Sequence, residues 1–588
     1  MFPQTSPSSS RRAWLKWWAV VIGCGWGHWA WLLANVLRVP ATYGYDWPGH
    51  FTYLYYLAAH GTLPDAGVSA QFFNPPLYYV CVVAFQRLTG VDLARAGQLF
   101  NLLVALLSYA VLVGVCRRLW GARLLPLVWG VGFYVSNPVI YRTFGMMRPE
   151  VLLILGFLLA GWLVAKECAT HCAVETRPVS FRFALLSGGL AALAFCTRQW
   201  GGFLEVALWL WLLVVCWPRL RSSATRWAGI GLLGIQALVF GALVGGYLWY
   251  RGASLWTFNA PPHAFDPAFL TRLELGMLFT HPIRPALNGR FWPTLYADFW
   301  GDYWRYWREA LWHDPLPTSA GTVRALARAM WAGLPVTLLL GIGVIFKPGK
   351  SARLTALTSS FHLFARLLIA ISLGGFVVFA SRYADPLKGD TVKSVYIVYL
   401  VPYCAWLLGG MSQWLTTVFP RYPWVSAALL VLLAIFVAPQ GLYQAPSRML
   451  SRTWNAPDVS CPITETFGDA ITLVGCDWAL TEAADSLTAT LVWRSDAYVP
   501  HSYKVFVHLL GAEGQVLAQS DAVPAAWQRP TYAWMVGEYI EDVHALTVMD
   551  LPQLDGMSLR VGLYNEGEGQ RLSTTQGQEY ALIYLNPF

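Results

Sequence analysis

Runs of about 17 to 25 mostly apolar residues recur through the first three quarters of this 588-residue chain. A helix of that length crosses the roughly 30 Å hydrocarbon core of a bilayer. Charged residues are only 12% of the chain, against about 25% in soluble domains. The sequence therefore predicts a polytopic α-helical membrane protein. We count about eleven runs, at 14–37, 92–116, 124–141, 150–166, 183–198, 200–217, 227–249, 329–346, 361–380, 395–411 and 423–442, and a shorter one at 75–88 near the surface.

Lysine and arginine gather in every second connection between these runs, which predicts that those connections are cytoplasmic. The N-terminus is then cytoplasmic, and an odd number of spans places the C-terminal part outside, as in a multi-pass plasma (inner) membrane protein. The first run is long and lacks a clear small-residue cleavage site, so we expect a retained helix. The basic groups are Arg11, Arg12 and Lys16; Arg117, Arg118 and Arg123; Lys166, Arg177 and Arg182; Arg219, Arg221 and Arg226; Lys347, Lys350 and Arg353; and Arg421.

Five connections are then extracytoplasmic, at 38–91, 142–149, 198–200, 250–328 and 381–394. The first and fourth are long and rich in Trp, Tyr and Phe. Disordered segments lack aromatic residues, and long loops in compact folds often carry function. We therefore expect these two loops to be ordered and functional.

The pattern changes after residue 452, where short alternating segments are separated by Gly, Asp and Pro. This spacing predicts an antiparallel β-sandwich over 453–588, following a membrane core over 1–452. No Ser-His-Asp arrangement, metal cluster or phosphate loop is evident there, which favours a capping or substrate-guiding module. Trp527, Tyr532 and Trp534 are expected to face outward, where they either stack on sugars or simply pack. The expected strands are 471–478, 487–494, 503–511, 543–549, 558–564 and 580–585.

The net charge of +9 hides two opposite contributions. Residues 453–588 carry five basic and seventeen acidic residues, a net charge of −12, which leaves +21 on residues 1–452. Because most basic residues of the apolar part lie in loops that set its orientation, we exclude nucleic-acid binding.

Eight of the ten cysteines fall in or beside predicted spans. Cys168 and Cys172 lack further ligands at metal spacing, which argues against a zinc site. Cys461 and Cys476 lie in the outer domain, where an oxidising compartment permits a disulfide. Spacing alone does not fix geometry, so a bridge and two free thiols remain equal alternatives.

Two connections carry acids beside the spans. Asp46 and His50 are four residues apart just beyond the first run, and Asp46 is either a general base in a partly desolvated site or the cap of a helix over 50–60. Arg148 and Glu150 open the fourth run, where ionisable groups pair with each other or line a cavity. Arg198, between two spans, is either an anchor or part of the same site.

Two later connections combine charges with aromatic residues. The segment FWGDYWRYW (299–307), with Asp298, Asp302, Arg305 and Arg308, is typical of an interfacial helix. The connection before the tenth run carries three cations, Arg382, Lys388 and Lys393, and also Asp390. Cations on the outer side depart from the positive-inside rule, and they could hold a lipid phosphate through charge-assisted hydrogen bonds.

These motifs together resemble the GT-C glycosyltransferases, and within them the bacterial protein-mannosyltransferase and aminoarabinose-transferase-like branch. The resemblance covers about residues 10 to 445 and extends to β-sandwich modules appended to such transferases. It rests on YDxxxHFxYLxxLxxHGxLP (45–64), FNPPLYY (73–79), RPE (148–150) and GDTVKSVY (389–396), and in the tail on KVFVHLL (504–510), RPTYAWMVGEYIED (529–542) and VGLYN (561–565).

The resemblance implies transfer of a sugar, with inversion, from a polyprenyl-phosphate carrier to a glycan, lipid or protein acceptor outside the membrane. Asp46 matches the acid that deprotonates or orients the acceptor hydroxyl. Many relatives have two adjacent acids there, whereas Trp47 follows Asp46 here; this puts metal binding in doubt, leaves no cofactor assigned, and makes Glu150 a possible second carboxylate. The implied phosphate ligands are Arg148, Arg198, Lys388 and Lys393, and the implied substrate contacts are Tyr43, His50, Asp302 and Tyr396.

The same residues suit this chemistry on physical grounds. A departing lipid phosphate can be stabilised by fixed cations, while the acceptor hydroxyl needs a base. The alternative is a lipid-linked glycan transporter (flippase), or a non-catalytic glycan-binding membrane protein, with the same basic surface. Transporters commonly show internal repeats and polar residues within the spans, and neither is evident here. The sugar and the acceptor stay unassigned.

Overall fold

The structure is a computed structural model of the 588-residue chain. Its described residues divide into a helical unit and a strand unit. The described residues are 7–38, 47–65, 72–91, 93–173, 179–252, 265–283, 286–304, 320–345, 355–383, 392–418, 420–421, 424–442, 455–480, 486–497, 499, 503–527, 531, 534, 536–548, 556–565 and 570–585.

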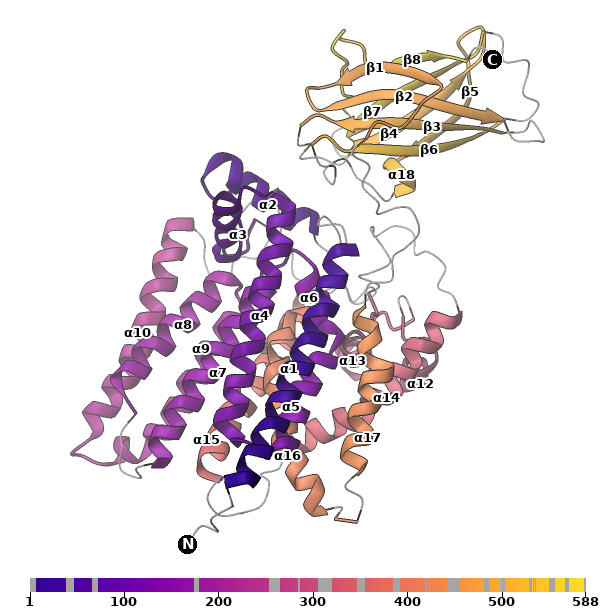
Figure 1. The fold of residues 1–588 in the computed structure, drawn as a ribbon. Coiled ribbons are helices and arrows are strands. Elements are labelled where there is room, and N and C mark those ends of the chain that lie inside the picture. The colour runs from indigo at the N-terminus through magenta and orange to yellow at the C-terminus, as the bar shows by residue number, and fades with distance from the viewer. Residues whose placement is uncertain are drawn as a thin grey trace. The chain divides into compact units, whose positions relative to one another are not determined.

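The helical unit is built from long apolar helices that run side by side (Figure 1). Shorter helices occupy the connections between them. Its elements are α1 (Pro7–Arg38), α2 (Trp47–His60), α3 (Leu77–Thr89), α4 (Leu93–Trp120), α5 (Leu124–Ser136), α6 (Pro138–Gly145), α7 (Glu150–Ala173), α8 (Phe181–Thr197), α9 (Gly201–Arg221), α10 (Arg226–Arg251), α11 (Pro267–Thr271), α12 (Leu275–Thr280), α13 (Phe291–Trp300), α14 (Ala320–Ile345), α15 (Thr355–Tyr383), η1 (Ser394–Leu400), α16 (Val401–Val418), α17 (Trp424–Leu432), η2 (Leu433–Val437) and η3 (Ala438–Gly441).

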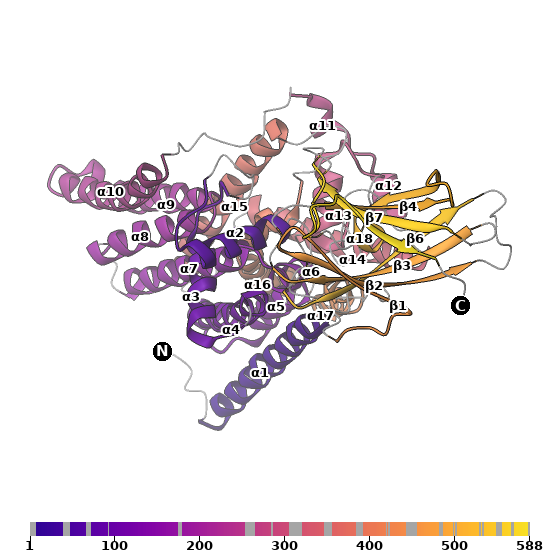
Figure 2. The ribbon, with the colours of Figure 1, turned by 90° about the horizontal axis from the view of Figure 1, so that it is seen from above.

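Every predicted span coincides with a helix or with consecutive helices. Nine helical segments among the described residues are long and apolar enough to cross a membrane, or ten if the bent pair α5 and α6 is one span. α8 has 17 residues, about 25 Å, yet it returns the chain antiparallel beside α7. In Figure 2, α7 to α10 are neighbours. The prediction of a polytopic helical membrane protein is confirmed.

The predicted span 124–141 is not one straight helix, because α5 and α6 meet at a 50° bend. Pro138 lacks an N–H group and disfavours helical geometry at the preceding residue. Asn137 is accordingly extended (φ −82°, ψ 120°), and its side-chain oxygen accepts a hydrogen bond from the Val139 N–H at 3.0 Å, which caps α6. The bend places the whole of α6 in the buried interior of the unit.

The expectation that the spans lack polar residues is also wrong. The Gln236 side chain in α10 is fully buried and donates a 2.6 Å hydrogen bond to Glu205 of α9. α8 approaches α10 closely at the same level, since a Cβ added to Gly188 would lie 2.4 Å from the Gln236 carbonyl oxygen. Glycine is therefore required at this crossing.

The strand unit contains two four-stranded antiparallel sheets, in the orders β1-β2-β3-β6 and β5-β4-β7-β8. This confirms the all-β C-terminal region. β1 and β5 lie outside the predicted strands, because their polar, half-exposed sequences hide the alternation expected of a strand. The elements are β1 (Cys461–Phe467), β2 (Ile471–Leu480), β3 (Ser486–Ser495), β4 (Tyr503–Leu510), β5 (Val516–Ala522), α18 (Pro524–Trp527), β6 (Tyr539–Thr547), β7 (Ser558–Asn565) and β8 (Ala581–Tyr584).

The strand unit does contain a chain of Ser, His and Asp side chains, contrary to the sequence-based expectation. Ser520 Oγ of β5 lies 3.0 Å from His544 Nδ1, and His544 Nε2 lies 2.9 Å from Asp542 Oδ2. His544 and Asp542 are almost completely buried, and β5 and β6 belong to different sheets. The arrangement therefore fastens one sheet to the other.

Of the three aromatic residues expected to face outward, only the side chain of Trp534 can be compared with the structure, and it does not face outward. Trp534 is 1% exposed, so it packs in the interior. Tyr532 and the side chain of Trp527 lie outside the described residues.

Candidate functional site

Three cations from three separate connections converge on one buried ring, that of Tyr396 in η1. The Arg198 guanidinium carbon lies 5.5 Å from the ring centroid, the Lys393 ammonium 5.6 Å and the Arg148 guanidinium carbon 6.0 Å. Cations at such distances are attracted to the electron-rich face of an aromatic ring. The expected phosphate ligands Arg148, Arg198 and Lys393 and the expected contact Tyr396 therefore belong to one cluster, called the Tyr396 cluster below.

Glu150, at the start of α7, joins the two arginines of this cluster. One carboxylate oxygen lies 3.3 Å from Arg148 Nε, and the other lies 3.3 Å from Arg198 Nε. The Glu150 and Arg148 side chains have no exposed surface, and that of Arg198 is 9% exposed. Both oxygens of Glu150 face a guanidinium, so the carboxylate orients the two arginines.

The FNPPLYY motif supports the cluster from a third side. Pro75 and Pro76 cannot continue a preceding helix, and α3 begins directly after them. Asn74 Oδ1 accepts a hydrogen bond from Arg198 Nη1, and the Tyr79 hydroxyl lies 2.6 Å from His50 Nδ1. The motif thus links the expected residue His50 of α2 to Arg198.

The same motif holds the loop that carries Arg148. The Tyr78 hydroxyl donates to Asn101 Oδ1 at 3.1 Å, and Asn101 Nδ2 donates to the Met146 carbonyl oxygen at 2.7 Å. Both side chains are buried. The backbone two residues before Arg148 is therefore fixed to α4, which restricts where the guanidinium can lie.

His50 is completely buried. Burial lowers the pKa of its imidazole well below the usual value, and the positive charges of Arg148, Arg198 and Lys393 lower it further. The imidazole is therefore neutral at physiological pH.

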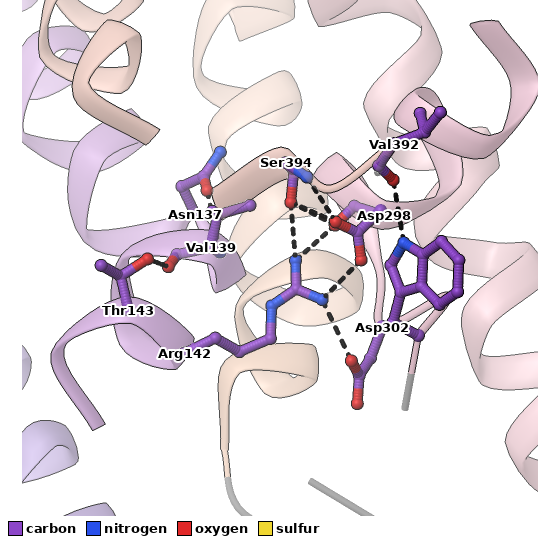
Figure 3. Close-up of polar contacts among 9 residues, drawn as sticks. Asn137, Val139, Arg142, Thr143, Asp298, Asp302, Val392 and Ser394 are labelled. Carbon is purple, nitrogen blue, oxygen red and sulfur yellow. Dashed lines mark hydrogen bonds and ion pairs between the residues drawn. The ribbon is translucent and has the colours of Figure 1, made fainter. Parts of the chain in front are cut away.

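A second buried cluster, the Arg142 cluster, includes Ser394, the residue that follows Lys393 in the sequence; Figure 3 shows Ser394 with Arg142, Asp298 and Asp302. Arg142 Nη1 lies 3.2 Å from Asp298 Oδ1 and 3.1 Å from Asp302 Oδ1, and Arg142 Nη2 donates to the Asp298 carbonyl oxygen. The second oxygen of Asp298 accepts hydrogen bonds from the backbone N–H and the hydroxyl of Ser394, both at 2.6 Å. Asp298 thereby fixes the backbone that carries Lys393.

Burial of Asp298 raises the pKa of its carboxyl group, although Arg142 and the two hydrogen bonds from Ser394 lower it. The guanidinium thus offsets part of the cost of keeping the carboxylate out of water.

The interfacial-helix interpretation of 299–307 is corrected for the residues that the structure describes. α13 ends at Trp300, and Trp300, Tyr303 and Trp304 are all nearly fully buried. Trp304 Nε1 donates to the Val392 carbonyl oxygen at 2.8 Å, beside Lys393. The segment packs into the helical unit because the acids around it pair with Arg142. Arg305 and Arg308 lie outside the described residues.

Each of the five connections expected on one side of the membrane contributes to these two clusters. They supply His50 and Asn74, Arg148, Arg198, Asp298, and Lys393. Asp302, an expected substrate contact, lies in the Arg142 cluster. Tyr43, Asp46 and Lys388 lie outside the described residues, as does Asp390.

Sequence reasoning missed Arg142, Asn74, Tyr79 and Ser394, and it gave Asp298 no role in the site. Asn74, Tyr79 and Ser394 lie within motifs that were recognised but treated as a whole. Arg142 directly follows a predicted span, and an arginine at the end of an apolar run is the signal that could have found it.

Among the described residues, no three His, Cys, Asp or Glu side chains gather in a way that could hold a metal ion. Glu150, Asp298 and Asp302 each have a guanidinium partner. These carboxylates are therefore already paired, and the three cations that converge on Tyr396 suit an anionic ligand.

No family model and no curated protein sequence matches this chain. Among solved structures, it is similar to ArnT from Cupriavidus metallidurans bound to undecaprenyl phosphate, with 14% identity, a TM-score of 0.30 and coverage of 69% of this chain and 80% of ArnT. It is also similar to the arabinosyltransferase EmbB from Mycobacterium smegmatis, with 12% identity, a TM-score of 0.32 and coverage of 94% of this chain and 64% of EmbB. At such low values, we draw the function from the residues of the site alone.

Proposed function

We propose that this chain is an integral-membrane glycosyltransferase that moves a sugar from a polyprenyl-phosphate donor to an acceptor hydroxyl on the extracytoplasmic side. The convergence of Arg148, Arg198 and Lys393 on the buried Tyr396 ring is the observation that supports it most. Fixed cations in a site of low dielectric stabilise charge more strongly than mobile ones in water. A phosphate that departs with a negative charge is the leaving group they suit.

In this mechanism, the acceptor oxygen attacks the anomeric carbon while the bond from that carbon to the phosphate oxygen breaks. The bonding electron pair leaves with the phosphate, which the three cations bind. The acceptor proton passes to the carboxylate of Asp46, in the connection that also carries His50. Attack opposite the leaving group inverts the anomeric carbon.

Glu150 has a positioning role in this proposal, since it bridges the two arginines. The C-terminal region, residues 453–588, is proposed to be a separate extracytoplasmic domain that guides a glycan, lipid or protein acceptor.

The test is turnover by purified protein supplied with polyprenyl-phosphate sugars and candidate acceptors. Asp46→Asn is expected to lower kcat by roughly 100-fold or more, the usual contribution of a general base, with KM for the donor little changed. Asp65→Asn is the matched control, because Asp65 is an exposed acid on the same connection. Lys393→Met is expected to raise KM for the donor.

Full turnover by Asp46→Asn on a confirmed substrate would rule out Asp46 as the base. Movement of intact lipid-linked sugar between leaflets, without bond cleavage, would replace the proposal with transport.

A further inference from the structure

Four side chains form a hydrogen-bonded chain whose direction is set at one end. Arg198 Nη1 contacts Asn74 Oδ1. A guanidinium has only donors, so the amide oxygen of Asn74 must face Arg198 and the amide nitrogen must face away. This fixes the orientation of the Asn74 amide on chemical grounds.

The next link passes from Asn74 to Tyr79, since burial raises the pKa of the Tyr79 hydroxyl and a hydrogen bond with the Asn74 side chain lowers it. Because the Asn74 oxygen faces Arg198, its amide nitrogen donates to the Tyr79 hydroxyl oxygen. A hydroxyl has a single proton, and the remaining partner of Tyr79 among the described residues is His50 Nδ1 at 2.6 Å. Tyr79 therefore donates its proton to His50 Nδ1.

The last link determines where His50 carries its own proton. The imidazole is neutral and accepts a hydrogen bond at Nδ1, so its proton is on Nε2. His50 Nε2 is buried and has no hydrogen-bond partner among the residues that the structure describes. A buried donor without a partner costs stability, which a bound acceptor restores.

The surroundings of His50 indicate the ligand. The charges of Arg148, Arg198 and Lys393 all act on the ring, so His50 lies near the Tyr396 cluster. A neutral donor beside three cations favours an oxygen acceptor with negative charge or lone pairs.

We infer that His50 donates a hydrogen bond from Nε2 to an oxygen atom of the lipid-linked donor, and that Arg198, Asn74 and Tyr79 are positioning residues that fix this proton. The identity of the ligand rests on the proposed function, whereas the position of the proton does not. These hydrogen bonds also make His50 unsuitable as the general base. Its only nitrogen without a partner among the described residues is Nε2, and Nε2 already carries a proton.

The sharpest variant is Asn74→Asp, which keeps the shape of the side chain and the contact with Arg198. A carboxylate has no donor, so Tyr79 would donate to residue 74, and His50 would have to donate from Nδ1. The position of the proton is read from the ¹⁵N signals of histidine-labelled protein, with His50→Gln identifying the His50 signal. We expect an Nε2–H imidazole in the wild type and an Nδ1–H imidazole in Asn74→Asp.

Addition of undecaprenyl phosphate in detergent then tests the ligand. A shift of the His50 Nε2 signal assigns the acceptor to the phosphate, a shift only with the sugar-bearing lipid assigns it to the sugar, and no shift with either overturns the inference. In kinetics, Asn74→Asp and His50→Ala are expected to raise KM for the donor roughly tenfold, and His50→Gln, which retains an N–H at that position, is expected to recover part of that loss.

An Nδ1–H or doubly protonated His50 in the wild type at pH 7 would also overturn the inference, whatever the activity. The expected proton position in a protein that turns over no polyprenyl-phosphate sugar would instead contradict the proposed function. Thermal unfolding of each variant separates these results from misfolding.

Discussion

The guanidinium of Arg142 contacts two carboxylates, one backbone carbonyl and one hydroxyl, and it has no exposed surface. Arginine can hold this set because its five donors lie in one rigid plane, whereas the lysine ammonium offers three donors from a single point. The side chain joins α6 to α13 and η1. A single residue thus connects three segments that lie more than ninety residues apart in the sequence.

Arg142→Lys tests this requirement. Loss of some contacts would leave Asp298 buried with incomplete compensation, and breaking a buried ion pair costs about 3 to 5 kcal/mol. We expect a clear fall in the thermal unfolding temperature of the detergent-solubilised protein. Arg182→Lys, at an exposed position, is the control and should unfold like the wild type. Equal unfolding temperatures for the two variants would refute this role.

The buried imidazole of His50 predicts a pH dependence of stability. Its folded-state pKa lies below the unfolded value of about 6.5, so the unfolded state binds more protons. Stability is therefore retained above pH ~6.5 and falls as the pH drops below it, by at most about 1.4 kcal/mol per pH unit. Among the described residues, the charged and titratable groups that act on or contact His50 are Arg148, Arg198, Lys393 and Tyr79.

The measurement is the thermal unfolding of wild type and His50→Gln between pH 7.5 and 5.5. We expect the wild type to lose more stability than His50→Gln over this range. Parallel curves would show that His50 does not contribute.

Among the elements, β1 and β2 bring the two outer cysteines together. Cys461 and Cys476 are opposite each other in the antiparallel register, and both are free thiols in this structure. Burial, and the neighbouring Cys461, raise the pKa of Cys476 to about 12. Because the thiolate is the reactive form, this pair is expected to oxidise slowly unless an oxidising compartment assists.

We predict that the pair forms a disulfide in protein isolated from a cell that exports this domain. A bridge closing a loop of about 15 residues stabilises by roughly 3 kcal/mol. Mass spectrometry after alkylation without reductant should find neither cysteine alkylated. Cys461→Ser should unfold at a lower temperature than the wild type. Full alkylation of both thiols in native protein would exclude the bridge. Cys196→Ser, within α8, is the control.

At the scale of the whole molecule, residues from five separate connections meet in two adjoining clusters. Arg148 precedes α7 and Arg198 follows α8, and their shared contact with Glu150 requires these two helices to run in opposite directions. The basic residues predict that the connections alternate between the two sides of the membrane, and the five connections that meet here are all predicted to lie on the same side. The side of the membrane on which the clusters lie is a prediction of the positive-inside rule.

Reporter fusions test that side. Alkaline phosphatase fused after Phe588 should be active, because the C-terminus is predicted to be extracytoplasmic. The same enzyme inserted after Ser223, between α9 and α10, should be inactive. A fluorescent protein at the same positions should give the opposite pattern. Activity at Ser223 and none at Phe588 would invert the proposed topology.

The sequence by itself determined the membrane class, the helical spans and the all-β C-terminal region, because each follows from the local periodicity and length of apolar segments. It also singled out Arg148, Glu150, Arg198 and Lys393 as site candidates, because charges beside apolar runs are rare enough to stand out, and Tyr396 through the resemblance carried by its motif.

Only the tertiary structure decided which of these residues meet. It broke the span 124–141 at Pro138, paired Arg142 with Asp298, and linked Arg198 through Asn74 and Tyr79 to His50. These contacts join residues far apart in the chain, and no local pattern records them. Their geometry is set by the packing of many helices at once, which is why, apart from the neighbouring pair Arg148 and Glu150, the partners of the buried charges emerged only from the folded chain.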